Sequence, residues 1–174
     1  MSDILGAVYD FLKTYVCPDV DIVRGWQNRA SLPNVSEYVV MTLQGHSRHG
    51  TNIHTENAFT PETGIDETVS MLMEYEVQID FCGLDEMAVS QNASICAMLG
   101  RDRRAVEFFA GYGLSGLFAD EPRSLPFQDD QQWVVRYTTT LHLTGWVRKT
   151  LHNPAFTSVM WTIENVDVHH PVTN

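Results

Sequence analysis

The chain has 174 residues, of which 44% are hydrophobic and 19% are charged. A chain of this size can bury roughly 70% of its unfolded surface without a disulfide or a structural metal, so we expect a single domain over residues 1–174. The formal net charge of −11 argues against a nucleic-acid binder, because gripping phosphates requires a basic surface. Such acidity suits either a channel through which DNA slides without sticking or an ordinary well-solvated protein.

The spacing of the cysteines indicates the redox compartment of the chain, and the hydropathy indicates whether it contains a membrane span. Cys17, Cys82 and Cys96 lie far apart and in no CxxC spacing, which favours buried thiols in a reducing compartment over a disulfide framework or a metal site. No run approaches the 18 apolar residues of a membrane span. The sequence therefore predicts a soluble chain that is neither exported nor embedded in a membrane.

The first third of the chain predicts one helix and two strands. Apolar residues recur at helical spacing over about residues 3–16, and Pro18 ends this amphipathic helix. Residues 20–26 are typical of a short strand, and residues 38–44 alternate as a second strand does. Residues 45–66 are polar and without periodicity, so we expect a long loop, or arm, that is mobile or packs on a partner.

Two stretches predict unusually long strands. Residues 71–81 are apolar at every odd position and polar at the even ones, and residues 132–143 repeat the alternation in a strand expected to reach residue 148. At about 3.3 Å per residue, each stretch spans roughly 35 to 40 Å, nearly twice the usual strand length. Contacts with neighbouring copies of the chain would use the excess. The side chains expected to point inward from the second strand are Trp133, Val135, Tyr137, Leu141 and Leu143.

Two helices are predicted between the long strands. Asp85 is expected to cap a helix that runs to Leu99 and stops at Gly100. Its apolar side is predicted to be formed by Met87, Ile95 and Leu99. A second, shorter helix is expected from about residue 102 to residue 111.

Shorter elements complete the pattern. Residues 114–119 predict a short edge strand, and Pro122 and Pro126 predict a rigid loop after it. A last strand is expected over about residues 156–168, followed by a short flexible tail at residues 169–174. The expected fold is a single α+β domain with a mixed, mainly antiparallel sheet whose long strands pack against two or three helices.

The search for chemistry yields mostly exclusions. Residues 111–116 match GxGxxG, but a helix is expected before them and a strand after them, so a glycine turn is favoured over a dinucleotide site. His46, His49 and His54 lack metal-site spacing and are interpreted as surface or interface residues. His169 and His170 fall in the tail. We expect no catalytic residue, no metal and no cofactor.

Three acids on one face of the first long strand, Glu74, Glu76 and Asp80, are the main candidates for a functional surface. Glu74 and Glu76 would lie about 7 Å apart, a distance that two-carboxylate chemistry uses. Their neighbours on that face are polar, however, and nothing apolar is present to raise a carboxyl pKa. A wet strand face is therefore favoured over catalysis. The acids are also expected to pair with arginines, within the chain or from a neighbour, such as Arg101, Arg103, Arg104 and Arg136.

Several short segments together form a recognisable pattern. They are residues 23–29 followed by Pro33, residues 38–42 and 48–52, the alternating residues 75–81 and the Arg136-Tyr137 pair. These segments resemble the neck and tail-completion proteins of tailed bacteriophages, in particular the tail terminators. It implies a small α+β subunit, without enzymatic activity, that forms a ring, usually a hexamer, on the last ring of the tail tube. Such a ring stops tube growth and offers a docking face to the head or neck.

The resemblance also implies the partners and the location. They are other copies of the chain, the tail tube protein, a neck or head-completion protein and, in a contractile tail, the sheath protein. The virion would be assembled in the host cytoplasm. DNA would pass through the lumen without specific binding, and Glu74, Glu76 and Asp80 would repel it there. Subunit contacts are expected on the arm and at the ends of the long strands. The candidate interface residues are Arg48, His49, Asn52, His54, Arg101, Arg103, Arg104 and Arg136.

Two alternatives stay open from the sequence. One is a head–tail adaptor one layer above the terminator, with a different ring stoichiometry. The other is a small α+β enzyme or ligand-binding domain with a cleft lined by Tyr75, Trp133, Tyr137 and Trp161. For this second alternative, a plain aromatic core is the stronger interpretation of the same four residues.

Overall fold

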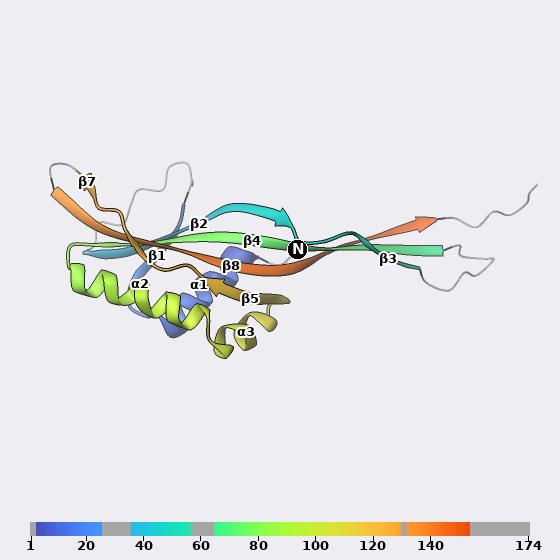
Figure 1. The fold of residues 1–174 in the computed structure, drawn as a ribbon, viewed down its shortest axis with the longest axis horizontal. Coiled ribbons are helices and arrows are strands. Elements are labelled where there is room, and N and C mark those ends of the chain that lie inside the picture. The colour runs from blue at the N-terminus through green and yellow to red at the C-terminus, as the bar shows by residue number, and fades with distance from the viewer. Residues whose placement is uncertain (1–2, 26–35, 57–64, 130–131, 154–174) are drawn as a thin grey trace, which may run out of the picture.

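A computed structural model describes residues 3–25, 36–56, 65–129 and 132–153. In these residues three helices cover one face of a long twisted sheet, and the other face is open (Figure 1). The strand order is β1-β2-β4-β8-β5, with β1 parallel to β2 and the other neighbours antiparallel. The predicted α+β class with a mixed, mainly antiparallel sheet is thus confirmed.

The sheet is built around two very long central strands. The strands on the main path are β1 (Asp21–Arg24), β2 (Glu37–Arg48), β4 (Ile65–Gly83), β8 (Gln132–Asn153) and β5 (Leu114–Ala119). The short strand β3 (Ile53–Glu56) pairs with β4, whereas β6 (Arg123–Ser124) and β7 (Phe127–Asp129) pair with β8. β4 and β8 pair in register along the whole of β4, from Ile65 opposite Asn153 to Gly83 opposite Val135.

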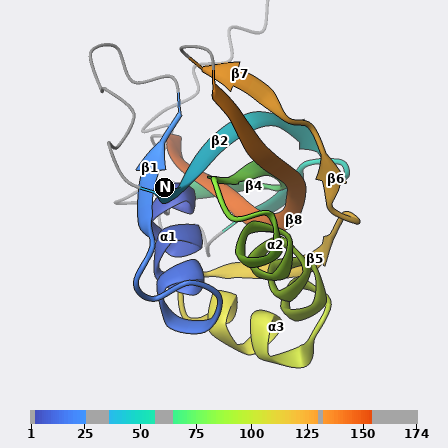
Figure 2. The same cartoon turned by 90° about the vertical axis from the view of Figure 1, so that its left-hand side faces the viewer.

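The helices α1 (Ile4–Tyr15), α2 (Glu86–Gly100) and α3 (Arg103–Ala110) lie close to the predicted positions. Each begins at an aspartate, Asp3, Asp85 or Asp102, whose carboxylate accepts hydrogen bonds from backbone N–H groups of the first turn. Viewed end-on, the strands curve over the three helices (Figure 2). None of the described helices is long and apolar enough to span a bilayer.

The core lies between the helices and the covered sheet face. The odd-numbered side chains of β4 from Met73 to Phe81 are buried there, as the alternation predicts. Phe11 of α1 and Phe109 of α3 pack against each other with ring centroids 5.0 Å apart. The largest fully buried side chains are Phe11, Phe81, Phe109, Leu12, Met41, Ile79, Leu141 and Leu143.

Two predicted inward side chains are on the surface. Trp133 is 69% exposed, because β4 ends opposite Val135 and β8 runs on past it with only β7 alongside. Met87 is 75% exposed, because it lies in the first turn of α2 and that helix buries another face. The residues that α2 buries are Val89, Ala93, Cys96, Ala97 and Gly100, with Ile95 and Leu99 only partly buried.

The prediction of a loop over residues 45–66 is wrong for most of the described residues in that span. β2 continues to Arg48, β3 occupies Ile53–Glu56 and β4 already begins at Ile65. These segments are polar because they lie beyond the core, where backbone hydrogen bonds to β4 hold them without a buried face. Residues 57–64 lie outside the described part, as do the predicted strand at 156–168 and the tail at 169–174.

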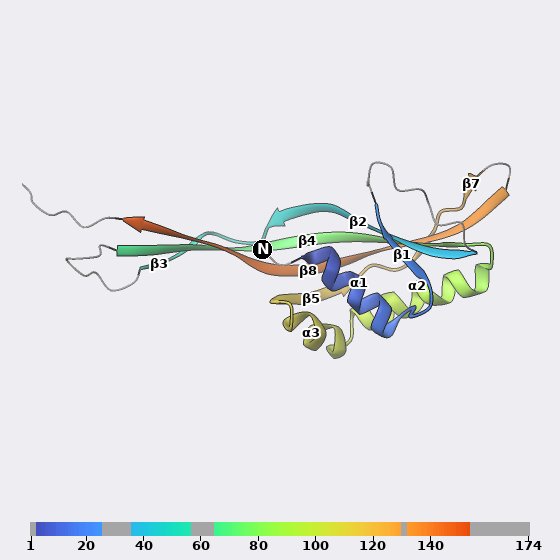
Figure 3. The same cartoon turned by 180° about the vertical axis from the view of Figure 1, so that it is seen from behind.

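The sheet continues past the helices as a three-stranded ribbon. We call β3, residues 65–72 of β4 and residues 146–153 of β8 the distal ribbon. Beyond the pairs Arg48–Met73 and Leu114–Gly145, neither β2 nor β5 accompanies the central strands. Residues 65–72 span about 25 Å. Figure 3 shows the distal ribbon projecting beyond the helical layer, so this part of the sheet lacks the helical cover that the rest has.

Candidate functional site

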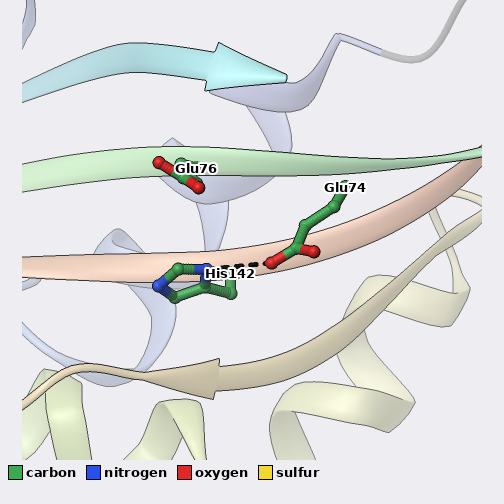
Figure 4. A group of neighbouring side chains, drawn as sticks. All are labelled: Glu74, Glu76 and His142. Atoms are coloured by element: carbon green, nitrogen blue, oxygen red, sulfur yellow. Dashed lines mark hydrogen bonds and ion pairs between the residues drawn. The ribbon is translucent and has the colours of Figure 1, made fainter. Parts of the chain in front are cut away.

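The open face of the sheet carries a cluster of two carboxylates and an imidazole. Glu74 and Glu76 project from β4 and His142 from β8, where His142 is the residue opposite Glu76 (Figure 4). One ligand atom from each of the three side chains lies within 4.8 Å of the other two. Glu76 is exposed, while Glu74 and His142 are half-buried. The alternation predicts the position of the two glutamates, and pairing with β8 adds the histidine.

His142 is held from several sides. Its Nδ1 lies 3.1 Å from Oε1 of Glu74, and its Nε2 lies 3.6 Å from Oδ2 of Asp120. The ring of Phe118 from β5 stacks on the imidazole at a centroid distance of 4.2 Å and an angle of 17°. Nε2 is buried and has no hydrogen-bond partner among the described residues. The orientation of the ring is therefore fixed by stacking and by Glu74.

A second histidine approaches the same carboxylate. Nδ1 of His49, just after β2, lies 3.4 Å from Oε2 of Glu74. Glu74 thus contacts an imidazole with each of its two oxygens. The arrangement of two imidazoles and two carboxylates on one polar face is a set of donors that transition-metal ions accept.

Asp80 does not belong to this exposed surface. It is only 8% exposed, and its carboxylate accepts hydrogen bonds from Nε2 of Gln78 and from the hydroxyl of Thr138. The prediction of a solvated acid is therefore wrong for Asp80. Cross-strand neighbours on β8 cover it, and their positions depend on strand register, which the alternation of β4 alone does not give.

The predicted pairing of these acids with arginines within the chain is also wrong. Arg101 binds Glu121 at 3.0 Å and the carbonyl of Ala119, and Arg103 binds Glu107. Arg136 donates to the carbonyl of Leu125 at 3.0 Å. Glu74 contacts the imidazoles of His49 and His142 instead.

The remaining interface candidates lie at or near the base of the distal ribbon or at a helix corner. Arg48 and Asn52 hydrogen bond to each other at 3.0 Å, and His54 contacts Glu67 of β4. Arg104, in the first turn of α3, is exposed. The eight candidates therefore form three separate groups, at the ribbon base, at the α2–α3 corner and near the start of β8, rather than one patch.

The glycine-rich segment is a turn, as the sequence predicts. α3 ends at Ala110, Gly113 has a φ of 70°, and β5 begins at Leu114. A left-handed residue between a helix and a strand explains the need for glycine at position 113.

The three cysteines are buried and free, as predicted. Burial raises the pKa of Cys17 and of Cys82 to about 11 and that of Cys96 to about 12. Thiols of this kind are poor nucleophiles and poor metal ligands near neutral pH.

Within the part of the chain that the structure describes, the aromatic cleft of the ligand-binding alternative does not form. Tyr75 is in the core, Trp133 is exposed, and Trp161 lies outside the described residues. A cavity of about 260 Å³ does border Tyr75, but neither Trp133 nor Tyr137 lines it. The lining residues are Ile4, Tyr75, Gly113, Leu114, Gly145, Trp146, Val147 and Arg148, which include no His or Asp.

The distal ribbon carries exposed apolar side chains. Trp146 is 45% exposed, and Ile53, Val147 and Leu151 are exposed to a similar degree. A shallow hollow of about 370 Å³ lies on the ribbon face that includes Trp146. It is lined by Ile53, Thr55, Thr68, Ser70, Trp146 and Arg148. Trp146 and Ile53 share this hollow, whereas Val147 and Leu151 lie on the opposite face of the ribbon, because side chains alternate along β8.

Comparison with known proteins gives one family. The profile described as phage neck terminator protein matches residues 3–173, nearly the whole chain. No curated protein matches the chain.

Proposed function

Because the chain belongs to the phage neck terminator family, we propose that it is a tail terminator that closes a homo-hexameric ring on the end of the tail tube. The family role is structural, in the assembly of the phage neck and tail, and the location that it implies is the virion. The ring would stop tube polymerisation and present its other face to the neck or head-completion protein. We further propose assembly in the host cytoplasm, before the tail joins the head.

The observation that carries this proposal is the distal ribbon. It extends the sheet by about 25 Å beyond the last pairs of β2 and β5 and leaves Trp146, Ile53 and Leu151 exposed in a single chain. A neighbouring subunit would cover these side chains. Head-to-tail contacts between different surfaces generate a ring when the rotation closes, and this geometry leaves no free interface around the circumference.

The interface candidates divide according to their contacts within the chain. We propose that Arg48, His49, Asn52 and His54 contact a neighbour, since they lie at or near the base of the ribbon. Arg103 and Arg104 are exposed cations at the α2–α3 corner and would meet acids of the next subunit. Arg101 and Arg136 bind carbonyl groups of their own chain, which makes them weaker candidates.

Which surface of the chain would line the central channel of the ring is a prediction. We propose that the open sheet face with Glu74 and Glu76 lines the lumen, whereas Asp80 is buried and does not take part. Glu76→Lys would then allow ring formation but slow genome passage, measured as infectivity of assembled particles. Glu76→Gln is the matched control, because it changes the same side chain without placing a positive charge in the channel. Equal infectivity of the two variants would contradict the lumen assignment.

The family argues against the enzyme alternative, since it is a family of structural phage proteins. The head–tail adaptor alternative differs in ring number and in partner, because an adaptor would bind on the portal side. Tail tube protein is the proposed direct partner of the terminator, and sheath protein would be a further one in a contractile tail.

The test is the mass of the purified chain by light scattering on a sizing column, with negative-stain images of the peak. A ring with a central hole and six times the 19.7 kDa of one chain would support the proposal. A monomer that forms such rings on added tail tubes would support it equally. A monomer that does not assemble on added tail tubes would overturn the proposal. A ring with a different number of subunits that binds portal-side proteins would overturn it as well.

A further inference from the structure

We propose that Glu74, Glu76 and His142 bind a divalent transition-metal ion on the open face of the sheet, with Zn²⁺ as the best match. This inference goes beyond the structural role of the family and revises the expectation of no metal site. It does not depend on the ring, because all three side chains belong to one chain.

The sheet places the three donors together. Glu74 and Glu76 lie two residues apart on β4 and therefore share a face, and the register sets His142 opposite Glu76. Their ligand atoms lie within 4.8 Å of one another. In a tetrahedral site with bonds of about 2.1 Å, ligand atoms are about 3.4 Å apart, so the donors need only a short inward shift. Glu76 is exposed and free to make it.

The unpaired nitrogen of His142 is the second observation. With Nδ1–H donating to Glu74, Nε2 is a bare acceptor, buried, and 3.6 Å from an acceptor oxygen of Asp120. A metal on Nδ1 moves the proton to Nε2, which then donates to Asp120. Metal-binding histidines almost always donate their other ring N–H to a carboxylate or carbonyl in this way. In the metal-bound form, Nε2 of His142 and Oδ2 of Asp120 are therefore a donor and an acceptor instead of two acceptors.

The surroundings fit a transition metal better than calcium or magnesium. Phe118 fixes the plane of the His142 imidazole. Nδ1 of His49 lies 3.4 Å from Oε2 of Glu74, so His49 is near enough to supply the fourth ligand in place of a water molecule. Imidazole with carboxylate suits Zn²⁺, whereas Ca²⁺ takes six to eight oxygens and Mg²⁺ an octahedron of oxygens.

Other histidine and carboxylate pairs on the sheet provide internal comparisons. His152 lies 2.7 Å from Asp66, and His54 contacts Glu67, but neither pair is joined by a third donor in the described residues. These pairs are expected to bind Zn²⁺ far more weakly than the cluster, because each offers only two ligands.

The experiment is a calorimetric titration of the full chain, stripped of metal by a chelator, with Zn²⁺. We expect one strong site per chain. Glu76→Gln should weaken this site more than about tenfold, because one of three ligands loses its charge. The side chain of Glu76 makes no hydrogen bond or ion pair with the described residues, so the substitution should leave the fold intact. Thermal melting without metal checks this. The matched control is Glu56→Gln, an exposed glutamate of β3, which should bind Zn²⁺ as the parent chain does.

Two further variants test the individual roles. His142→Gln should abolish the strong site, and Asp120→Asn should weaken it about 10- to 100-fold, because Asp120 positions the imidazole rather than touching the metal. Substitution by Co²⁺ should give a visible spectrum of the parent chain that is lost in Glu76→Gln. The proposal is overturned if the parent chain shows no strong site, or if Glu76→Gln and His142→Gln bind Zn²⁺ like the Glu56→Gln control.

Discussion

A Cβ atom built at Gly100, the last residue of α2, would lie 2.8 Å from the Cβ of Ala119 in β5. Ala119 is fully buried, and its Cβ moves only with the backbone. The helix therefore sits on the sheet at a distance that only glycine at position 100 permits. A side chain there would push α2 away from β5.

Gly100→Ala is expected to destabilise the fold by about 1–3 kcal/mol, as overpacking of a rigid contact does. The free energy of unfolding in urea measures the loss. Gly45→Ala is the matched control, because a Cβ at Gly45 meets no atom within 4 Å. Equal stability of the two variants would show that α2 and β5 can separate without cost.

The first helix should show an acid-sensitive contribution to stability. Asp3 binds the Arg24 guanidinium at 2.8 Å and accepts the backbone N–H of Gly6, and these two interactions lower its pKa from 3.8. Since the folded pKa lies below the unfolded one, the contribution is complete above about pH 4 and is lost as the pH falls through the folded pKa.

Asp3→Ala should therefore cost about 1 kcal/mol near neutral pH and less at a pH below the folded pKa, where only the hydrogen bond of the neutral carboxyl is left to lose. Asp3→Asn should keep most of the cap and lose only the ion pair, whose contribution is small because both groups are exposed. Denaturant unfolding at several pH values checks both variants. A loss that does not vary with pH would contradict this assignment.

The buried thiols should resist alkylation in the native chain. Burial raises the pKa of Cys96 to about 12 and the pKa values of Cys17 and Cys82 to about 11. Little thiolate therefore forms near neutral pH. Iodoacetamide followed by mass spectrometry should find no rapid labelling in buffer and three labels in denaturant. Rapid native labelling at Cys96 would mean that α2 opens from the sheet.

The distal ribbon should be needed for assembly but not for folding. Trp146→Ser combined with Leu151→Ser should leave the melting temperature nearly unchanged, because both side chains are exposed in the single chain. The same variant should fail to form rings, as measured by light scattering. Leu117→Ser, at a comparably exposed residue of β5, serves as control. A double variant that still forms rings would place the subunit interface elsewhere.

The sequence predicts well wherever a segment has one buried face. α1 shows a helical period and β4 a period of two, because each packs one side on the core. The glycine turn before β5 is equally visible, since a left-handed residue favours glycine. These local rules are enough for the α+β class.

What the sequence misses depends on contacts between distant segments. β3 and the end of β2 have no buried face and hence no period, yet backbone pairing to β4 makes them strands. The burial of Asp80 and the approach of His142 to Glu74 follow from the register of β4 with β8. The residue pattern of one strand does not contain its register with another strand. The cluster of Glu74, Glu76 and His142 could therefore not be predicted from the pattern of β4 or β8 alone.

The pairing of β4 with β8 also bears on the order in which the molecule folds. Gly83 pairs with Val135 and Ile65 with Asn153, so the intervening loop grows from about 50 residues at one end to almost 90 at the other. The strands should zip from the short-loop end, where helices also cover them, and the distal ribbon should form last and open first. Its amides should exchange with solvent faster than those of the core. In the proposed ring, a subunit with a folded core would therefore still be able to adjust its distal ribbon to the neighbouring subunit.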